Sequence, residues 1–391
     1  MGLGAIITSG EQNALLPDQL LECITEVRVE QSLDEPTRFA IRFQEDLEGG
    51  EPTIMKADEL QCERMITIAV SAGGAIKCLV RGPITDVKCS VKLGGPGSWY
   101  EIHGTDRRAE LDRKCIQRAW TGRASEAAQT ILSPVFTTDI EQTPIVYGAP
   151  RSGARQVSQT LNQRATDTAF VRQIARQNNL HFWVDYKCET RGLGGDALDV
   201  TETTHVRPSP PRPQASPAGP NSVDQIQLVP NVTVKLRVHV DKDQCQNVTV
   251  FDLSMNPDQP SQAPGRALDD RDLNQHRAAV SDPQPTIRQD GQRLAGCQSE
   301  RDVCITTAGN QDELQTKSEA ALTDAGWFVN ATASTTAHML GGVLIPHDVV
   351  EVEGLGKKHS GPYQVKTVTH VVNAADHFMD LELRHNAIGG R

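Results

Sequence analysis

Aromatic residues are scarce in this 391-residue chain, where Phe, Trp and Tyr together make up 4% of the sequence. This scarcity disfavours surfaces that stack sugars or nucleobases on aromatic rings. No run of 18 apolar residues is present, so we expect no membrane insertion. Acidic residues outnumber basic ones by 50 to 39, and the net charge of −11 disfavours nucleic-acid binding, which needs clustered cations. The start, MGLGAIITSG, lacks the segments of a signal peptide, so we expect synthesis and assembly in the cytoplasm.

Local catalytic motifs are also missing. The nine cysteines include no C-x-x-C pair, the 11 histidines include no H-E-x-x-H, and no serine lies in G-x-S-x-G. We therefore expect no catalytic residue, no cofactor and no metal. Paired carboxylates for glycoside cleavage depend on a separation in space, so the sequence leaves them open. His370 and His377 flank an expected hairpin turn, and we interpret them as exposed or half-buried strand-end residues rather than as ligands.

Short alternating segments dominate residues 1–110. Phe39, Ile41 and Phe43 alternate with arginines, which is the period-two pattern of a half-buried strand. Further strands of this kind, separated by turns such as Gly82-Pro83, are expected at 66–70, 77–80, 84–90 and 99–103. We predict a first antiparallel β-barrel here. Its front part is acidic, with 13 acids and 5 bases between Asp18 and Arg64.

Residues 111–190 have a different pattern and are predicted to form a helical and mixed connecting domain. Residues 124–132 are amphipathic and end at a Ser-Pro pair. Thr166 and Asp167 can cap a second helix, in which Phe170 belongs to an apolar stripe. Residues 180–184 then alternate as a strand.

Basic residues are concentrated in this connecting domain. Five Arg and one Asp lie between Arg151 and Arg176. Arg164, Arg172 and Arg176 belong to this group. They are either a solvated helix face or an interface with an acidic partner, and the sequence leaves both interpretations open.

The second half of the chain begins after residues 191–221, which we interpret as a Pro-rich linker because six prolines fall between positions 206 and 220. Residues 222–391 are predicted to form a second β-barrel with an insertion at about 255–330. The insertion combines a polar arm over 255–300 with a helix over 312–325. The fold class is therefore α+β, mainly β, with two antiparallel β-barrels joined by a helical segment.

Two stretches carry a family resemblance. The first, Gln159 to Phe182, has Asn162 in a Gln/Asn-rich entry, an acidic cap at Asp167, Phe170 at the end of Asp-x-x-Phe, and Arg172 in an apolar helix before a short strand. It resembles the signature of the baseplate hub proteins of contractile injection machines, namely phage late control protein D and the N-terminal part of VgrG spike proteins.

The second stretch, Pro346 to Asn386, is similar to the closing barrel strands of the same family. The family pattern places a turn glycine before Tyr-x-Val-x-x-Val-x-His and ends in an alternating strand before Arg and Asn. Its matches here are Gly361, Tyr363, Val365, His370, Arg384 and Asn386. The insertions at 191–221 and 255–300 depart from the family pattern.

The resemblance implies a structural role. Two related β-barrels in each chain let a homotrimer present six barrels, so that the trimer adapts a hexameric inner tube to a trimeric spike. The implied partners are the inner tube protein, a separate spike protein and other baseplate proteins, in a phage tail or a tail-like particle. No oligosaccharide-binding-type module or glycine-punctuated β-helix follows residue 391, so we expect the spike to be another polypeptide. The alternatives are a hub with peptidoglycan-cleaving activity and a cell-surface carbohydrate-binding module.

Overall fold

The structure is a computed structural model, and it describes most of the chain. The described residues are 4–33, 35–45, 54–72, 75–92, 97–148, 161–191, 197–209, 234–239, 245–256, 258–268, 275–281, 287–288, 291–292, 302–305 and 308–389. Strands outnumber helices throughout these ranges, so the expected mainly β, α+β class is confirmed. None of the described helices is both long and apolar enough to cross a membrane.

The N-terminal part is an antiparallel sheet with short helical turns. Its elements are β1 (Ala5–Ser9), β2 (Ala14–Leu15), α1 (Asp18–Leu21), β3 (Ile24–Ser32), β4 (Arg38–Gln44), η2 (Ile54–Lys56), η3 (Asp58–Leu60), β5 (Met65–Ala72), β6 (Ala75–Ser90), β7 (Trp99–Thr105) and α2 (Arg108–Leu111). The predicted alternation holds on β4, where Phe39, Ile41 and Phe43 are buried and Arg38 and Arg42 are exposed. These apolar residues belong to one N-terminal core cluster.

The prediction of a turn at Gly82-Pro83 is wrong. Residues 75–90 form the single strand β6, which pairs with β5 as far as Pro83 and with β7 from Ile84 onward. A Cβ on Gly82 would lie 1.7 Å from the carbonyl oxygen of Thr105, so only glycine allows the strand to approach β7 this closely. The Gly-Pro pair therefore marks a change of neighbours within a strand and not the end of one.

The middle of the chain combines small sheets with two helices. It contains β8 (Cys115–Trp120), β9 (Gly122–Arg123), α3 (Ala124–Leu132), β10 (Thr137–Ile140), β11 (Val146–Tyr147), β12 (Leu161–Thr166), α4 (Asp167–Gln177), β13 (His181–Arg191) and β14 (Ala197–Arg207). Both predicted helices are present. The Thr166 hydroxyl accepts a hydrogen bond from the backbone N–H of Ala169 at 3.3 Å and so caps α4 as expected.

The structure differs from the expected Pro-rich linker over its central part. Ala197–Arg207 is β14, which pairs with β13 along its whole length and with β10 at its end. Leu198, Glu202 and Val206 alternate as its buried residues, and the prolines begin only at Pro208. The prolines near residue 210 therefore do not justify a linker that begins as early as residue 191. Residues 210–221 lie outside the described residues.

The C-terminal part contains the remaining elements. These are β15 (Lys235–Arg237), β16 (Val250–Met255), β17 (Ala263–Leu268), β18 (Gln275–Val280), β19 (Gly291–Gln292), α5 (Gln311–Ala325), β20 (Val329–Thr336), α6 (Ala337–Leu340), β21 (Val349–Glu353), α7 (Gly356–His359), β22 (Gly361–Asn373), β23 (His377–His385) and β24 (Ile388–Gly389). The predicted helix is α5. The predicted polar arm contains secondary structure, because β17 and β18 pair antiparallel and Gly265 lies against Leu314 of α5.

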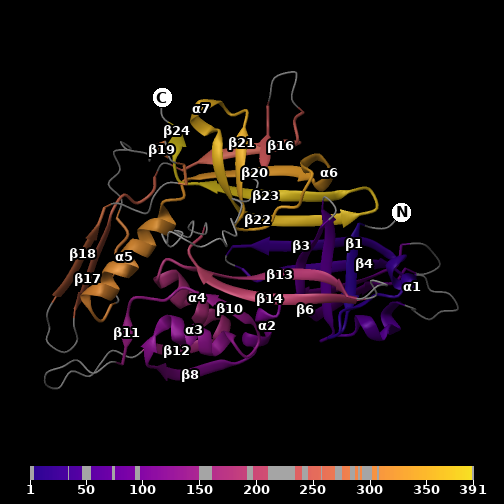
Figure 1. Cartoon of the computed structure of the whole chain (residues 1–391), viewed down its shortest axis with the longest axis horizontal. Helices are drawn as coiled ribbons and strands as arrows, with labels where there is room; N and C mark the ends of the chain where they lie inside the picture. The colour runs from indigo at the N-terminus through magenta and orange to yellow at the C-terminus, as the bar shows by residue number, and fades with distance from the viewer. Residues whose placement is uncertain are drawn as a thin grey trace, which may run out of the picture.

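The N-terminal and C-terminal parts share one continuous sheet. Its strand order is β10-β14-β2-β1-β5-β6-β7-β4-β3-β22-β23-β20-β16, and the antiparallel pair β3 and β22 joins the two parts. We call this pair the seam. Figure 1 shows β3 beside β22 at the centre of the molecule, with the β17–β18 hairpin and α5 on one side. Within the described residues the strands form no closed barrel.

Candidate functional site

Eight neighbouring strands of the sheet present one face to the cores and the other to solvent. In spatial order they are β6, β7, β4, β3, β22, β23, β20 and β16, and the sheet continues beyond β6 because residues 75–83 of that strand also pair with β5. At the seam Val29 pairs with His370 on the buried face, and Arg28 pairs with Val371 on the opposite face. On β23 Leu381 is buried and Asp380 is exposed. We call the solvent side of these eight strands the outer face, and its polar residues include Glu26, Arg28, Glu30, Arg42, Asp252, Thr332, Thr369, Asp380 and Glu382.

Two histidines lie buried beneath the seam, and this corrects the expectation of exposed or half-buried residues. His370 is fully buried and His377 is 9% exposed. Their rings share a 3.0 Å hydrogen bond, and the second ring nitrogen of His370 lies 3.2 Å from the amide oxygen of Gln31. Burial lowers the pKa of both imidazoles. The Gln31 amide also donates to the carbonyl of Leu79 on β6 at 2.7 Å. These contacts tie the C-terminal strands to the N-terminal sheet.

The first family stretch places its residues around α4. Phe170 is buried and stacks on Trp120 with 6.4 Å between ring centroids. Asp167, in the first turn, accepts a hydrogen bond from the Gln163 amide at 2.7 Å. Asn162 is exposed on β12. The buried members hold α4 against β8 and β12, which is a packing role.

The three arginines of the expected interface occupy different surroundings. Arg164 is exposed on β12. The Arg172 guanidinium lies 3.6 Å from the Glu35 carboxylate in the same chain, so it links α4 to the N-terminal part. Arg176 lies at the end of α4 and lines a pocket. The structure therefore does not bring the three together into one patch.

The second family stretch forms the end of the C-terminal sheet. Tyr363 and Val365 are buried on β22, and the Tyr363 hydroxyl donates to the carbonyl of His359 at 2.8 Å. Gly361 has φ +138, a conformation that side chains rarely adopt, and Arg288 lies 3.3 Å from the position of its missing Cβ.

Two polar residues close that stretch. The Arg384 guanidinium donates to the Gln364 amide oxygen at 2.8 Å and lies 4.1 Å above the Trp327 ring. The side-chain oxygen of Asn386 accepts from the backbone N–H of Ile287 at 2.9 Å. Both residues therefore fix neighbouring segments.

Buried ion pairs, which the sequence analysis missed, join the N-terminal part to the middle part. Arg108 is almost fully buried and lies 2.5 Å from the carboxylate of Asp106. Its guanidinium also donates to the backbone carbonyls of Glu35 and Phe182. Arg81 of β6 contacts Glu202 of β14 at 2.8 Å. The feature of the sequence that could have indicated the pair is local, because Asp106 is followed directly by two arginines.

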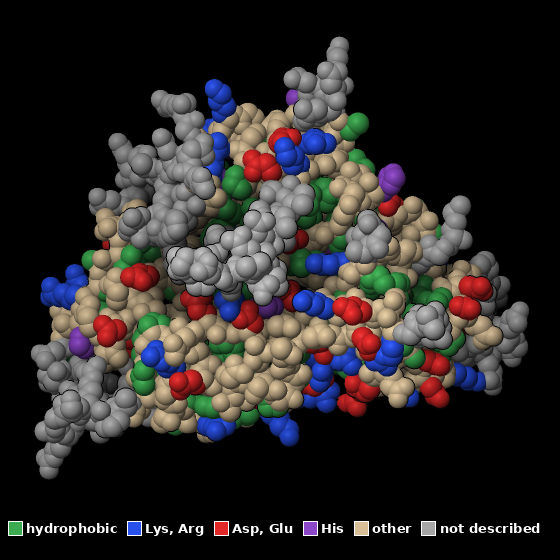
Figure 2. All heavy atoms as spheres, viewed as in Figure 1, with side chains coloured by type: hydrophobic (Ala, Val, Ile, Leu, Met, Phe, Trp, Pro, Cys, Tyr) green, Lys and Arg blue, Asp and Glu red, His purple; other side chains and the backbone are tan. Residues whose placement is uncertain are grey.

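Charge is unevenly distributed over the surface. Figure 2 shows Lys and Arg side chains along the lower border, below β8 and β12, and Asp and Glu side chains over the N-terminal sheet at right. Arg113 and Lys114 precede β8, Arg118 lies on it, and no acid falls between positions 113 and 125. On the paired strand β12, Arg164 is exposed. We call these four residues the basic ribbon.

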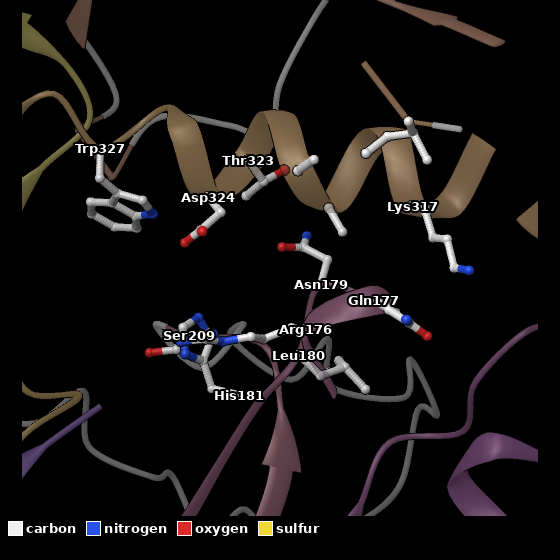
Figure 3. Close-up of a pocket in the computed structure, with 13 residues that line it drawn as sticks. Arg176, Gln177, Asn179, Leu180, His181, Ser209, Lys317, Thr323, Asp324 and Trp327 are labelled. Atoms are coloured by element: carbon white, nitrogen blue, oxygen red, sulfur yellow. The ribbon is translucent and has the colours of Figure 1, made fainter. Parts of the chain in front are cut away.

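A pocket of about 310 Å³ opens between the end of α4 and one face of α5. Arg176, Gln177, Asn179 and His181 line one wall, together with Leu180. Ala320, Ala321 and Asp324 of α5 line the other, with Lys317, Thr323, Trp327, Ser209 and Ile305 around them. Figure 3 shows the Asn179 side chain extending toward α5 and the Asp324 side chain extending from α5 into the pocket. The described residues contain no group of three or more His, Cys, Asp or Glu placed to hold a metal ion.

The fold has clear relatives among solved structures. A tail protein from Neisseria meningitidis matches with a TM-score of 0.62 and 13% identity over 97% of this chain and 96% of that one. A 43 kDa prophage tail protein from Shewanella oneidensis matches with a TM-score of 0.58 and 13% identity over 97% of both chains. The chain has the fold of these tail proteins.

A third similar structure is a Francisella PdpA–VgrG complex, which matches with a TM-score of 0.54 and 10% identity over 99% of this chain and 53% of that one. Neither a protein-family model nor a curated protein sequence matches the chain.

Proposed function

We propose that this protein is the structural baseplate hub of a contractile tail-like injection particle. In this role a homotrimer joins a hexameric inner tube to a trimeric spike formed by a separate protein. The fold likeness to phage and prophage tail proteins supports the proposal. The observation that carries it is that eight consecutive strands of the larger sheet divide at the seam into two sets of four.

Each side of the seam supplies a comparable unit. The N-terminal unit runs β3, β4, β7 and β6 outward from the seam, and the C-terminal unit runs β22, β23, β20 and β16. In both units the seam strand continues into its outer neighbour through a hairpin connection, and all pairs are antiparallel. The third and fourth strands follow the hairpin in one unit and precede it in the other. Three copies contain six such units, the number that a hexameric tube requires.

The two edges of this sheet suggest how copies meet. Residues 85–90 of β6 pair only with β7, and β16 pairs only with β20, within the described part of the chain. Open antiparallel edges readily add a strand from another chain. We infer that β16 of one copy lies beside β6 of the next, which is a head-to-tail contact that closes after three copies.

Charge supports a second contact between copies. All four residues of the basic ribbon are exposed, although Arg118 lies over the Trp120 ring and Arg164 points to the opposite side of the β8–β12 pair. Residues 18–64 of the N-terminal part, in contrast, carry 13 acids and 5 bases. The ribbon of one copy would lie against this acidic part of its neighbour, and Arg164 is the expected centre of the contact because it is exposed on β12. Arg172 and Arg176 would contribute less, because Arg172 contacts Glu35 in its own chain.

The proposal assigns each part of the chain a role. Residues 1–110 and 222–391 would be the two related barrel-type domains of the family, and residues 111–190 the connection between them. The inner tube protein, the spike protein and other baseplate proteins would bind the assembled ring. The hub would act within a phage tail or a tail-like particle and would need no catalytic step.

Mass in solution and negative-stain images test this function. At 42.6 kDa per chain a trimer has a mass of about 128 kDa, three times the monomer, and the images should show a flat threefold ring with a central hole. Val250→Lys places a charge on the β16 edge and should weaken the trimer. Val146→Lys, at a similarly exposed valine on β11, is the control. A compact monomer at every concentration would contradict the proposal.

The charge contact has its own test. Arg164→Glu should raise the trimer dissociation constant at low salt, and the effect should shrink at high salt. Lys187→Glu changes an exposed cation on β13 and serves as the matched control. If both variants trimerise equally well at low salt, the basic ribbon is not part of the interface. The proposed contact between strand edges would be unaffected by that result.

A further inference from the structure

The pocket owes its space to the composition of one face of α5. Lys317, Ala320, Ala321 and Asp324 occupy positions i, i+3, i+4 and i+7 of the helix, so they form one stripe along it. The two alanines in the middle of the stripe leave a gap opposite the end of α4. At about 310 Å³ the gap has the volume of a small-molecule site.

Opposite charges mark the two ends of this stripe. Lys317 and Asp324 are seven residues apart, which corresponds to about 10 Å along a helix. The Lys317 ammonium lies 2.9 Å from the Glu313 carboxylate, and it has three N–H donors, so it can also bind an acceptor in the pocket. In Figure 3 the Arg176 side chain extends along the wall opposite α5, toward the end where Asp324 lies.

The Asp324 end has the groups that bind a sugar ring. Trp327 lines the pocket there, and because Arg384 covers one face of its ring, the C–H groups of a sugar would pack against the other face. The Asp324 carboxylate accepts hydrogen bonds, and the Asn179 amide both donates and accepts them. Adjacent hydroxyl groups of a sugar need this combination. One aromatic ring is enough for one sugar, so the low aromatic content of the chain does not oppose such a site.

The Lys317 end has different chemistry. A single ammonium beside the Gln177 amide suits one carboxylate. A single carboxylate suits it better than a phosphate dianion, because Glu313 lies 2.9 Å from the same ammonium and opposes each added negative charge. The distance between the two ends is close to the length of two linked sugar rings.

We propose that this pocket binds a disaccharide unit of an acidic glycan. The neutral sugar lies between Trp327, Asp324 and Asn179, and the carboxylate of the acidic sugar contacts Lys317. This binding site is independent of the proposed hub function, since every residue that forms it belongs to one chain. A chain that failed to trimerise could still bind the glycan, and a trimer could form without it.

Calorimetry with defined disaccharides tests the site on the full chain. The probes are a glucuronic acid–N-acetylglucosamine disaccharide and the neutral disaccharide of two N-acetylglucosamines. The acidic probe should bind about tenfold more tightly, because one charge-assisted hydrogen bond is worth about a factor of ten. Lys317→Met should remove that preference, and Asp324→Asn should weaken the binding of both probes. Lys358→Met, on the exposed helix α7, should change neither.

A cavity-filling variant separates this pocket from other surfaces. Ala321→Phe places a ring in the gap and removes no hydrogen-bonding group, so it should abolish binding of the acidic probe. Its melting temperature, compared with that of the wild type, reports whether the variant is folded. Unchanged affinity in Ala321→Phe would overturn the proposal. Saturation-transfer NMR of the wild type gives an independent decision, and no transfer from the protein to the acidic probe at about 10 mM would also overturn it.

Discussion

The stability of the C-terminal sheet is expected to fall in mild acid, and His385 is the group from which this can be calculated. It is buried against the Tyr363 ring, with 4.9 Å between centroids. Burial, helped by the nearby Arg288 and His359, lowers the pKa of His385 to about 4. The unfolded chain keeps a histidine pKa of about 6.5. Between these two values the unfolded state binds more protons, so the free energy of unfolding decreases as the pH falls.

The size of the effect follows from the shift. A pKa difference of about 2.5 corresponds to about 3 kcal/mol once the pH lies below both values. Between pH 7 and pH 5 the loss from His385 alone is about 2 kcal/mol by the same relation. His370 and His377 are buried too, with pKa values that are also lowered, so they act in the same direction. The pKa of His205 is raised by its contacts with Asp185 and Asp139, and it acts in the opposite direction.

A difference measurement isolates His385 from these groups. Urea unfolding is followed by tryptophan fluorescence at pH 7, 6 and 5, at one protein concentration, for the wild type and for His385→Gln. Glutamine keeps a hydrogen-bond donor and does not titrate. The wild type should lose about 2 kcal/mol more than the variant between pH 7 and pH 5. Parallel curves for the two proteins would show that His385 is not held neutral by burial, and the reasoning would fail.

Three further predictions concern other parts of the fold. Phe170→Ala should lower the free energy of unfolding by about 3–5 kcal/mol in urea titrations, because the ring is fully buried, and a loss below about 1 kcal/mol would contradict the packing described. Asp106→Asn leaves the buried Arg108 without its anion and should cost about 3–5 kcal/mol by the same measurement, unlike Asp380→Asn on the exposed outer face. Cys78 is buried and burial raises the pKa of its thiol, so dilute hydrogen peroxide should oxidise the exposed Cys62 first and leave Cys78 as a thiol, and mass spectrometry that finds Cys78 oxidised before Cys62 would refute this.

Local patterns in the sequence were sufficient for the elements whose structure depends on neighbouring residues. α4 begins at the predicted Thr166 cap, and its apolar stripe packs as expected, because both signals lie within a few residues. β4 follows its alternating pattern for the same reason. Gly82 was misinterpreted, since its use depends on Thr105, which is close in space and distant in sequence. The burial of His370 depends on β3, more than 300 residues earlier in the chain.

The pocket was beyond sequence analysis for a related reason. Its two walls, the end of α4 and the face of α5, are separated by about 140 residues and meet only in the folded chain. The one local signal was the spacing of Lys317, the two alanines and Asp324. Alanines on a helix face normally indicate close helix packing, so that signal favoured a filled contact over an open one. Only the position of α4 decides between the two.

The seam determines how the proposed hub could carry force. β3 and β22 pair antiparallel over seven residue pairs, from Thr367 with Ser32 to Asn373 with Glu26. Hydrogen bonds in such a pair are perpendicular to the strands. A pull along the strands therefore loads all of them together, whereas a pull across the strands opens them one after another, at about 1 kcal/mol net for each bond.

The buried contacts beneath the seam add to the free energy needed to separate the two strands by a pull across them. Gln31 contacts His370 on one side and the backbone of β6 on the other, so separating β22 from β3 also removes a buried polar group from its partners. Leaving such a group unpaired costs about 1–3 kcal/mol. This cost applies at one position of the β3–β22 pair. It is smaller than the cost of breaking all the hydrogen bonds of the pair together. A hub that holds its two halves together during contraction is therefore expected to have the seam strands aligned with the direction of load.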